Sequence, residues 1–326
     1  MSKQYNICLD VGGTKVLGAV FDEQDQIIYR LKKRTKSGGE GSADVEQVII
    51  GVVEEMIRDS GIDPKELNAI ASCAPGVIDQ KNGVVLFTPN LPWRDYPIRE
   101  HMEQRFGVPF FVGNDVNLGV LGEHRFGAAK GYRNVAGFFI GTGLGGGMIV
   151  NGELYLGSRF MAGEFGHMVL DPEGPLCGCG QRGCLEAFSS KTGMTNYIRD
   201  QIVRGRETMM EEFVRGGVFR AKKLRRAVEA GDAVAIEAID RACHWLAVAT
   251  GSAINMLSPD RILISPTTAG TTYIIKKKDE SGVSLTLAGK NGLALWYDLN
   301  GHPVNEKNAH LSQGIYVSKG KKIAVR

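Results

Sequence analysis

A histidine and three cysteines that lie close together in the sequence have the side chains that zinc prefers. They are His167, Cys177, Cys179 and Cys184. Zn²⁺ favours a tetrahedral shell of nitrogen and sulfur ligands, and a site with four protein ligands keeps no open position for catalysis. The glycines between the cysteines let the backbone bend so that the three sulfur atoms converge. The cluster therefore predicts a structural zinc site rather than three unrelated buried thiols.

Two glycine-rich loops could bind phosphate groups through their backbone amides. Their residues are Asp10, Gly12, Gly13, Thr14 and Lys15 in the first glycine loop, and Gly141, Thr142 and Gly143 in the second. Successive N–H groups in such turns form a concave anion site. The carboxylate of Asp10 could in addition hold Mg²⁺ through water. Either loop alone is also consistent with a glycine-rich hairpin that binds no ligand.

The second glycine loop also satisfies the G-x-G-x-x-G pattern over residues 141–146. In dinucleotide-binding folds that pattern is followed at once by a helix. Here residues 147–152 read Gly-Met-Ile-Val-Asn-Gly, which predicts a strand and a hairpin turn. A Walker A motif does not occur in the sequence. A dinucleotide-dependent oxidoreductase is therefore the last of the functions that we consider.

Asp115 follows a short strand pattern and directly precedes a predicted helix over Val116–Phe126. An aspartate or asparagine at such a junction is often the residue that caps the helix N-terminus. The position alone favours this capping interpretation.

The elements around these residues indicate a duplicated α/β fold. The first half has strands at Tyr5–Asp10, Thr14–Phe21, Gln26–Lys33 and Leu67–Cys73 and a helix at Ala43–Asp59; the second half has strands at Asn134–Ile140, Gly146–Val150, Glu153–Leu156 and Arg261–Ile264 and helices between Met194 and Leu257. Each half opens with a meander of strands bent at a glycine loop. We expect an N-terminal lobe over residues 1–115, a C-terminal lobe over 116–264 with a cleft between them, and a β-rich tail over 265–326.

The composition excludes several classes of protein. The chain has 326 residues, a net charge of +3 and 43 glycines, nearly twice the usual glycine share of about 7%. The small charge gives no argument for a nucleic-acid partner, and no apolar stretch is long enough to span a membrane. The N-terminus lacks the apolar region of a signal peptide, so we expect a cytoplasmic protein. The other cysteines, Cys8, Cys73 and Cys243, have apolar neighbours and are expected in the core.

Together and in this order, the motifs resemble the ROK family of sugar kinases and regulators, which has the two-lobed actin-like ATPase fold. Asp10–Lys15 and Ile140–Gly147 match its two phosphate motifs, and Gly163–His167 and Cys177–Glu186 match its sugar and zinc signatures. The resemblance covers about residues 5–264, roughly four-fifths of the chain.

The resemblance implies an ATP-dependent hexokinase, with glucose as the expected substrate, Mg²⁺ and structural Zn²⁺ as metals, and a homodimer. It assigns Asp115 as the catalytic base, because a sugar hydroxyl is too weak an acid to ionise by itself; such a base contributes about 10²–10⁴-fold. It assigns the two glycine loops to the phosphates of ATP. The implied sugar-binding residues are Gly76, Asn90, Asn114, Asp115, Glu164, His167 and Glu186, of which His167 also binds zinc.

Two alternatives stay open beside the kinase. One is a catalytically impaired sugar-binding protein, and the other is a ROK-type sugar-responsive regulator without its DNA-binding domain. A complete regulator needs an N-terminal helix-turn-helix, whereas this chain begins only a few residues before its first predicted strand.

After Ile264 the sequence departs from the family pattern. A glycine-rich turn that packs on adenosine normally follows, but this chain has Ser265–Gly270, and its end resembles C-terminal sorting or stalk domains of secreted Bacteroidetes proteins. We therefore expect sugar binding to be independent of the tail and ATP to bind weakly.

Overall fold

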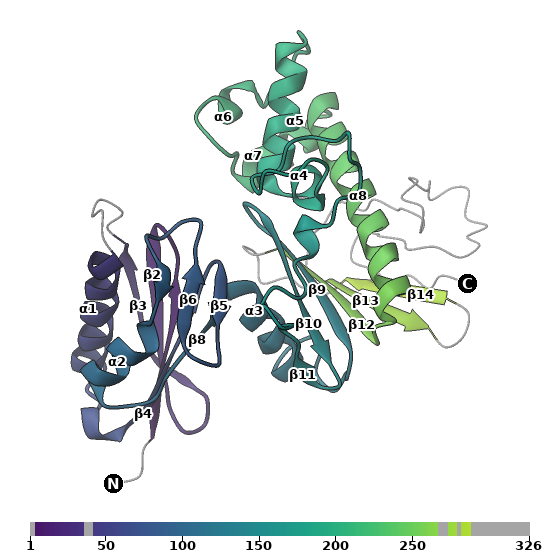
Figure 1. Cartoon of the computed structure of the whole chain (residues 1–326). Helices are drawn as coiled ribbons and strands as arrows, with labels where there is room; N and C mark the ends of the chain where they lie inside the picture. The colour runs from purple at the N-terminus through teal and green to yellow at the C-terminus, as the bar shows by residue number, and fades with distance from the viewer. Residues whose placement is uncertain (1–3, 36–41, 267–272, 279–281, 288–326) are drawn as a thin grey trace. The chain divides into compact units, whose positions relative to one another are not determined.

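The computed structural model describes residues 4–35, 42–266, 273–278 and 282–287. The chain divides into two compact units, which we treat separately (Figure 1). Unit 1 comprises residues 1–119 and 156–161, and unit 2 comprises residues 120–155 and 162–326.

Unit 1 is built on a five-stranded sheet with the order β3-β2-β1-β4-β8. Its strands are β1 (Tyr5–Val11), β2 (Lys15–Phe21), β3 (Ile27–Arg34), β4 (Leu67–Ala74) and β8 (Phe110–Asn114). The first three strands form the predicted antiparallel meander, and β4 and β8 run parallel to β1. A smaller sheet holds β5 (Val77–Asp79), β6 (Val84–Phe87) and β7 (Arg94–Tyr96).

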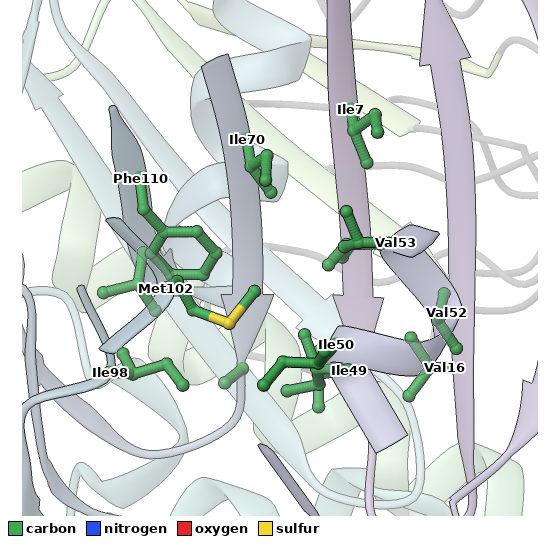
Figure 2. Close-up of a cluster of buried hydrophobic side chains, with 14 of the residues drawn as sticks. Ile7, Val16, Ile49, Ile50, Val52, Val53, Ile70, Ile98, Met102 and Phe110 are labelled. Carbon is green, nitrogen blue, oxygen red and sulfur yellow. The ribbon is translucent and has the colours of Figure 1, made fainter. Parts of the chain in front are cut away.

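Two helices, α1 (Ser42–Ser60) and α2 (Ile98–Phe106), cover one face of this sheet (Figure 1). Ile7, Ile70 and Phe110 are register neighbours on β1, β4 and β8 and are fully buried. Val53 of α1 and Met102 of α2 pack over this row in a single core cluster (Figure 2). The parallel strands are therefore fixed in register, so that their carboxyl ends lie along one edge of the sheet.

Unit 2 contains a six-stranded sheet with the order β11-β10-β9-β12-β13-β14. Its strands are β9 (Val135–Ile140), β10 (Leu144–Val150), β11 (Glu153–Leu154), β12 (Arg261–Pro266), β13 (Tyr273–Lys278) and β14 (Gly282–Leu287). The strands β9, β10 and β11 repeat the glycine-bent meander of unit 1, as predicted, and β12 runs parallel to β9.

The described helices from Asp115 onward are α3 (Asp115–Arg125), α4 (Leu185–Ser189), α5 (Lys191–Val203), α6 (Glu211–Arg215), α7 (Ala221–Glu229) and α8 (Ala233–Leu257). Helix α3 begins in unit 1 and ends in unit 2. The segment predicted to be helical between Met194 and Leu257 thus holds the greater part of α5 and all of α6, α7 and α8. The mixed α/β class predicted from the sequence is confirmed.

The atypical tail is described only in part. Strands β13 and β14 continue the sheet of unit 2 beyond β12. Most of the Ser265–Gly270 segment, and the whole of residues 288–326, lie outside the described residues. Among the helices that are described, none is both long and apolar enough to cross a membrane.

Candidate functional site

In unit 1, Asp10 and Asp115 lie at the carboxyl ends of β1 and β8, on either side of the end of β4. The register pairs Asp10 with Cys73 and Cys73 with Gly113. The Sγ atom of Cys73 lies 3.6 Å from Oδ1 of Asp10, so this cysteine borders the site and is not a plain core residue. The carboxyl ends of parallel strands are where α/β folds place their ligands.

The two aspartates are close enough to influence each other electrostatically. Although Asp115 is exposed as a residue, neighbouring protein atoms crowd its carboxylate, and this desolvation raises its pKa. The negative charge of Asp10 raises that pKa further, and the N–H of Val116 opposes both effects. Burial, and then the same charge of Asp10, raises the pKa of the Cys73 thiol. Asp115 is therefore a stronger base than an ordinary aspartate.

Asn114 performs the capping that the sequence position suggested for Asp115. Its Oδ1 accepts hydrogen bonds from the N–H groups of Val116 at 2.9 Å and Asn117 at 3.0 Å. Asp115 is the first residue of α3, and its Oδ1 accepts the neighbouring Val116 N–H at 2.9 Å. The helix end is thus satisfied without Asp115.

Asn114 also connects this corner to the predicted sugar-binding backbone at Gly76, because its Nδ2 donates to the carbonyl of Gly76 at 2.9 Å. Gly76 has φ of +106°, and a Cβ there would collide with the carbonyl of Phe87. Asn90 follows on the next loop, where a Cβ on Gly13 would lie 3.1 Å from its carbonyl oxygen. Unit 1 therefore brings the first glycine loop against the loop that carries Asn90.

The first glycine loop is closed by a hydrogen bond from Gly12 N–H to the carbonyl of Lys15 at 2.9 Å. Thr35, a buried residue just beyond β3, fixes this loop through two hydrogen bonds. The Thr35 hydroxyl donates to the Gly12 carbonyl at 2.8 Å and its N–H donates to the Thr14 carbonyl at 3.1 Å. Thr14 and Lys15 are exposed.

The second glycine loop joins β9 to β10 in unit 2 and is closed by Gly141 N–H donating to Gly143 O at 2.8 Å. Oε2 of Glu186, in α4, accepts the N–H of Leu144 at 2.8 Å. A Cβ on Gly143 would collide with that same oxygen, so a larger residue there would displace the carboxylate from the Leu144 N–H. Glu186, a predicted sugar-binding residue, therefore also braces this loop.

The four predicted zinc ligands converge in unit 2. Their ligand atoms all lie within 4.8 Å of one another. Sγ of Cys179 and Sγ of Cys184 are 3.7 Å apart, and Sγ of Cys177 is 3.8 Å from Nδ1 of His167. Sulfur ligands about 2.3 Å from a tetrahedral zinc are about 3.8 Å apart. The residues present therefore fit a closed zinc site.

The protonation of these thiols agrees with a metal-binding role. Burial raises the pKa of the Cys177 thiol to about 12 and raises that of Cys184 as well, whereas the N–H of Gln181 lowers the pKa of Cys179. Cys177 and Cys184 therefore keep their protons at neutral pH unless a cation is near. A divalent metal ion supplies the positive charge that converts such ligands to thiolates.

Glu164 and His167 lie at the two ends of a short 3₁₀ turn, η2 (Phe165–His167). This turn is pressed against β10, since a Cβ on Gly166 would collide with the carbonyl of Leu144. The sugar signature, the second glycine loop and the metal cluster thus form one packed region of unit 2.

Sequence reasoning did not find Thr35, Thr192 or the site contact of Cys73. Thr192 contacts the second glycine loop across 50 positions of sequence, and Thr35 contacts the first across 23. No local pattern marks such residues.

Comparisons with known proteins show what this chain is similar to. The ROK family's sequence model matches residues 6–273, nine residues beyond the end that the motifs indicated. The chain is 33% identical to the glucokinase of Thermotoga maritima over 269 residues, 81% of this chain and 82% of the relative. It is 32% identical to the glucokinase of Halalkalibacterium halodurans over 266 residues, 81% of this chain and 80% of the relative.

Regulators and solved structures are also similar to this chain. The xylose repressor of Bacillus subtilis is 35% identical over 196 residues, 60% of this chain and 50% of the repressor. The crystal structure of a ROK family glucokinase from Streptomyces griseus in complex with glucose and AMPPNP has a TM-score of 0.65 and 31% identity, covering 80% of this chain and 82% of that one. With its motifs in order and this match over most of its length, the chain belongs to the ROK family and has the actin-like ATPase fold of ROK sugar kinases.

Proposed function

We propose that this protein is an ATP-dependent hexokinase that converts glucose to glucose 6-phosphate. Glucokinase relatives of 32% and 33% identity, each aligned over 81% of this chain, support the proposal. The single structural observation that carries it is that Asn114, and not Asp115, caps α3. The Asp115 carboxylate is thereby available for chemistry.

In the proposed reaction, Asp115 accepts the proton of the C6 hydroxyl as that oxygen bonds to the γ-phosphorus of ATP. The bond from the γ-phosphorus to the β,γ-bridging oxygen breaks, and ADP leaves. The raised pKa of Asp115 suits this role, because a stronger base accepts the proton with a greater driving force.

Further residues of each unit, taken by itself, are assigned to the sugar. Unit 1 offers the backbone of Gly76, the exposed side chain of Asn90 and one N–H of the Asn114 amide, whose oxygen is committed to α3. Unit 2 offers Glu164, His167 and Glu186. Because Nδ1 of His167 lies toward Cys177, Nε2 is the ring atom that we assign to a sugar hydroxyl.

The phosphates of ATP are assigned to the backbone amides of the two glycine loops and to Lys15. Asp10 has the carboxylate that would hold Mg²⁺ through water, and its exposed position at the end of β1 fits this role. When bound with the nucleotide, Mg²⁺ neutralises charge on the phosphoryl oxygens.

We assign the cluster of His167 and the three cysteines to zinc with a structural role. Three unoxidised thiols suit a reducing compartment, and on that ground we place the protein in the cytoplasm. We also propose a homodimer, as expected from the family resemblance, and no nucleic-acid partner. Sedimentation would measure the oligomeric state.

A coupled ADP-release assay with glucose, mannose, fructose and N-acetyl hexosamines tests the proposal. We expect a hexose to bind, with slow phosphoryl transfer as long as residues 265–326 stand in the place of the family's C-terminal segment. Ordinary turnover, on the order of 1–100 s⁻¹ as for kinases generally, would show that this tail is a working substitute. Calorimetry with each sugar and with ATP should accompany the assay, since the sequence predicts weak ATP binding after the departure at Ile264. A hexose that binds without any ADP release would support the sugar-binding protein or the regulator instead.

A further inference from the structure

The start of α5 donates hydrogen bonds to two backbone carbonyls of the second glycine loop. The N–H of Lys191 donates to the carbonyl of Gly141 at 3.1 Å, and the N–H of Thr192 donates to the carbonyl of Thr142 at 3.1 Å. The hydroxyl of Thr192 donates to the same Thr142 carbonyl at 2.8 Å. Thr192 is half-buried, whereas Thr142 on the loop is exposed.

These bonds decide where the loop amides point. In a trans peptide the C=O and the following N–H project in opposite directions, and the described residues contain no cis peptide bond. With the carbonyls of Gly141 and Thr142 turned toward α5, the N–H groups of Thr142 and Gly143 point away from it. The loop therefore presents two consecutive donors on the side opposite the helix, as an anion site requires.

The N–H groups that bond to the loop have no hydrogen-bond partner within the helix. The first N–H groups of any helix have no partner within that helix. In α5 the hydroxyl of the N-cap residue Ser190 takes the N–H of Gly193, and the loop takes those of Lys191 and Thr192. The side chain of Thr192 adds a bond beyond what any residue at that position would supply through its backbone.

We propose that Thr192 is a positioning residue for ATP: it fixes the Thr142 carbonyl, and so aims the Thr142 and Gly143 amides at a nucleotide phosphate, without touching the nucleotide. This inference rests on the proposed function, because it takes the second glycine loop as a site for ATP phosphates.

The test compares three variants of the full chain. Thr192→Val removes the hydroxyl but keeps the N–H and the branched shape, and Thr192→Ser keeps the hydroxyl. Thr195→Val is the matched control, because the buried Thr195 hydroxyl donates to a carbonyl within its own helix, that of Lys191, at 2.7 Å. The measurements are calorimetric affinities for AMPPNP and for glucose, and hydrogen exchange of the Gly141 amide without ligands.

We expect Thr192→Val to weaken AMPPNP binding by about 3–10-fold, the effect of one lost hydrogen bond, with the glucose affinity changed by less than about twofold. Exchange of the Gly141 amide should accelerate in this variant, and Thr192→Ser should restore both values. Thr195→Val should lower stability without a selective loss of AMPPNP affinity.

Two outcomes would overturn the inference: AMPPNP affinity that is unchanged in Thr192→Val, or a loss shared equally with glucose or with Thr195→Val. If the wild-type protein itself binds no AMPPNP, the proposed function fails, and the nucleotide role of Thr192 fails with it. The exchange rates still separate these cases, because they report on the anchoring of the loop in the absence of nucleotide.

Discussion

The two glycine loops are alike in sequence but are supported by different kinds of structure. In unit 1 the first loop is held by Thr35, which continues a strand of the same meander. In unit 2 the second loop is held by the short helix α4, through Glu186, and by the start of α5, through Thr192. The N-cap of α4 is Cys184, a predicted zinc ligand.

The surroundings of the loops explain the difference. The site residues of unit 1 lie on or directly after strands with a continuous buried core beneath them. In unit 2 the described chain between Ala162 and Leu185 has one 3₁₀ turn and two isolated β-bridges. The zinc ion that we propose there would supply the long-range connections that strand pairing supplies in unit 1. We therefore expect zinc to support the site residues of unit 2 and not those of unit 1.

The largest effect should come from unit 1 and should leave the metal untouched. Because Asp115 is the proposed base, Asp115→Asn should lower kcat by about 10²–10⁴-fold while glucose affinity stays near that of the wild type. Steady-state kinetics and zinc analysis check this. The matched control is Asp63→Asn, which keeps the side-chain acceptor that caps the 3₁₀ turn before β4 and should leave kcat unchanged. A kcat near the wild-type value in Asp115→Asn would remove Asp115 from the base role.

The next effect should be confined to unit 2. Cys179 is exposed, so Cys179→Ser removes a ligand without opening a core cavity. We expect zinc and glucose affinities to fall together by about 10–100-fold, the usual cost of disturbing a metal centre. The melting temperature should fall as well. Cys8→Ser in β1 is the matched control and should keep its zinc. Folded wild-type protein that contains no zinc by elemental analysis would contradict the four-ligand site.

A smaller effect should follow from loosening the first glycine loop. Thr35→Val removes the bond to the Gly12 carbonyl, so AMPPNP affinity should fall by about 3–10-fold. Zinc content should not change. In the double variant with Cys179→Ser, the loss of AMPPNP binding free energy caused by Thr35→Val should add to the loss caused by Cys179→Ser. The losses caused by Thr192→Val and Cys179→Ser should not be additive, because both substitutions act on one packed region. If the effects of Thr35→Val and Cys179→Ser on AMPPNP binding were strongly non-additive, the two loops would not be supported independently, and the contrast between the units would be wrong.

The smallest effect concerns pH. Asp115 must be ionised to accept a proton, and its raised pKa places the acid limb of kcat/KM above the pKa of an ordinary aspartate, about 3.9. Activity should therefore be lost on acidification earlier than for an unperturbed carboxylate. Replacing Asp10 by Asn removes a negative charge that raises this pKa. Because Asp10 is also the proposed Mg²⁺ ligand, the shift is measured by NMR titration of the Asp115 carboxylate without ligands, where the midpoint should move to lower pH. A midpoint that stays in place would mean that the Asp10 charge does not act on Asp115.

Many of the strands and the metal cluster could be predicted from the sequence, because local residue patterns determine them. The alternation of apolar residues places β1 and β9, and the spacing of His167 and the cysteines is enough to identify the metal cluster. The division of work between Asn114 and Asp115 could not be predicted, because neighbouring polar residues at a strand end have the same propensities. Which of them caps the helix depends on backbone angles set by tertiary packing.

The residues that bond to the glycine loops could not be predicted from the sequence, for a different reason. Thr35 and Thr192 act through bonds to backbone carbonyls, which carry no side-chain signature. Their partners are 23 and 50 positions away in the chain. A threonine at the start of a helix or after a strand is ordinary in either place, and only the folded structure brings it to a loop.

The sheet order in unit 2 constrains whatever sequence follows the family-like part of the chain. Strand β12 lies between β9, which leads into the second glycine loop, and β13, and its Ile262 and Leu263 are buried. A chain cut after β12 would expose an apolar strand edge with unpaired amides and carbonyls, which is a template for aggregation. Strand β13, which pairs with this edge, therefore has a role in solubility that is separate from nucleotide binding, and any segment put in its place must also cover the open edge.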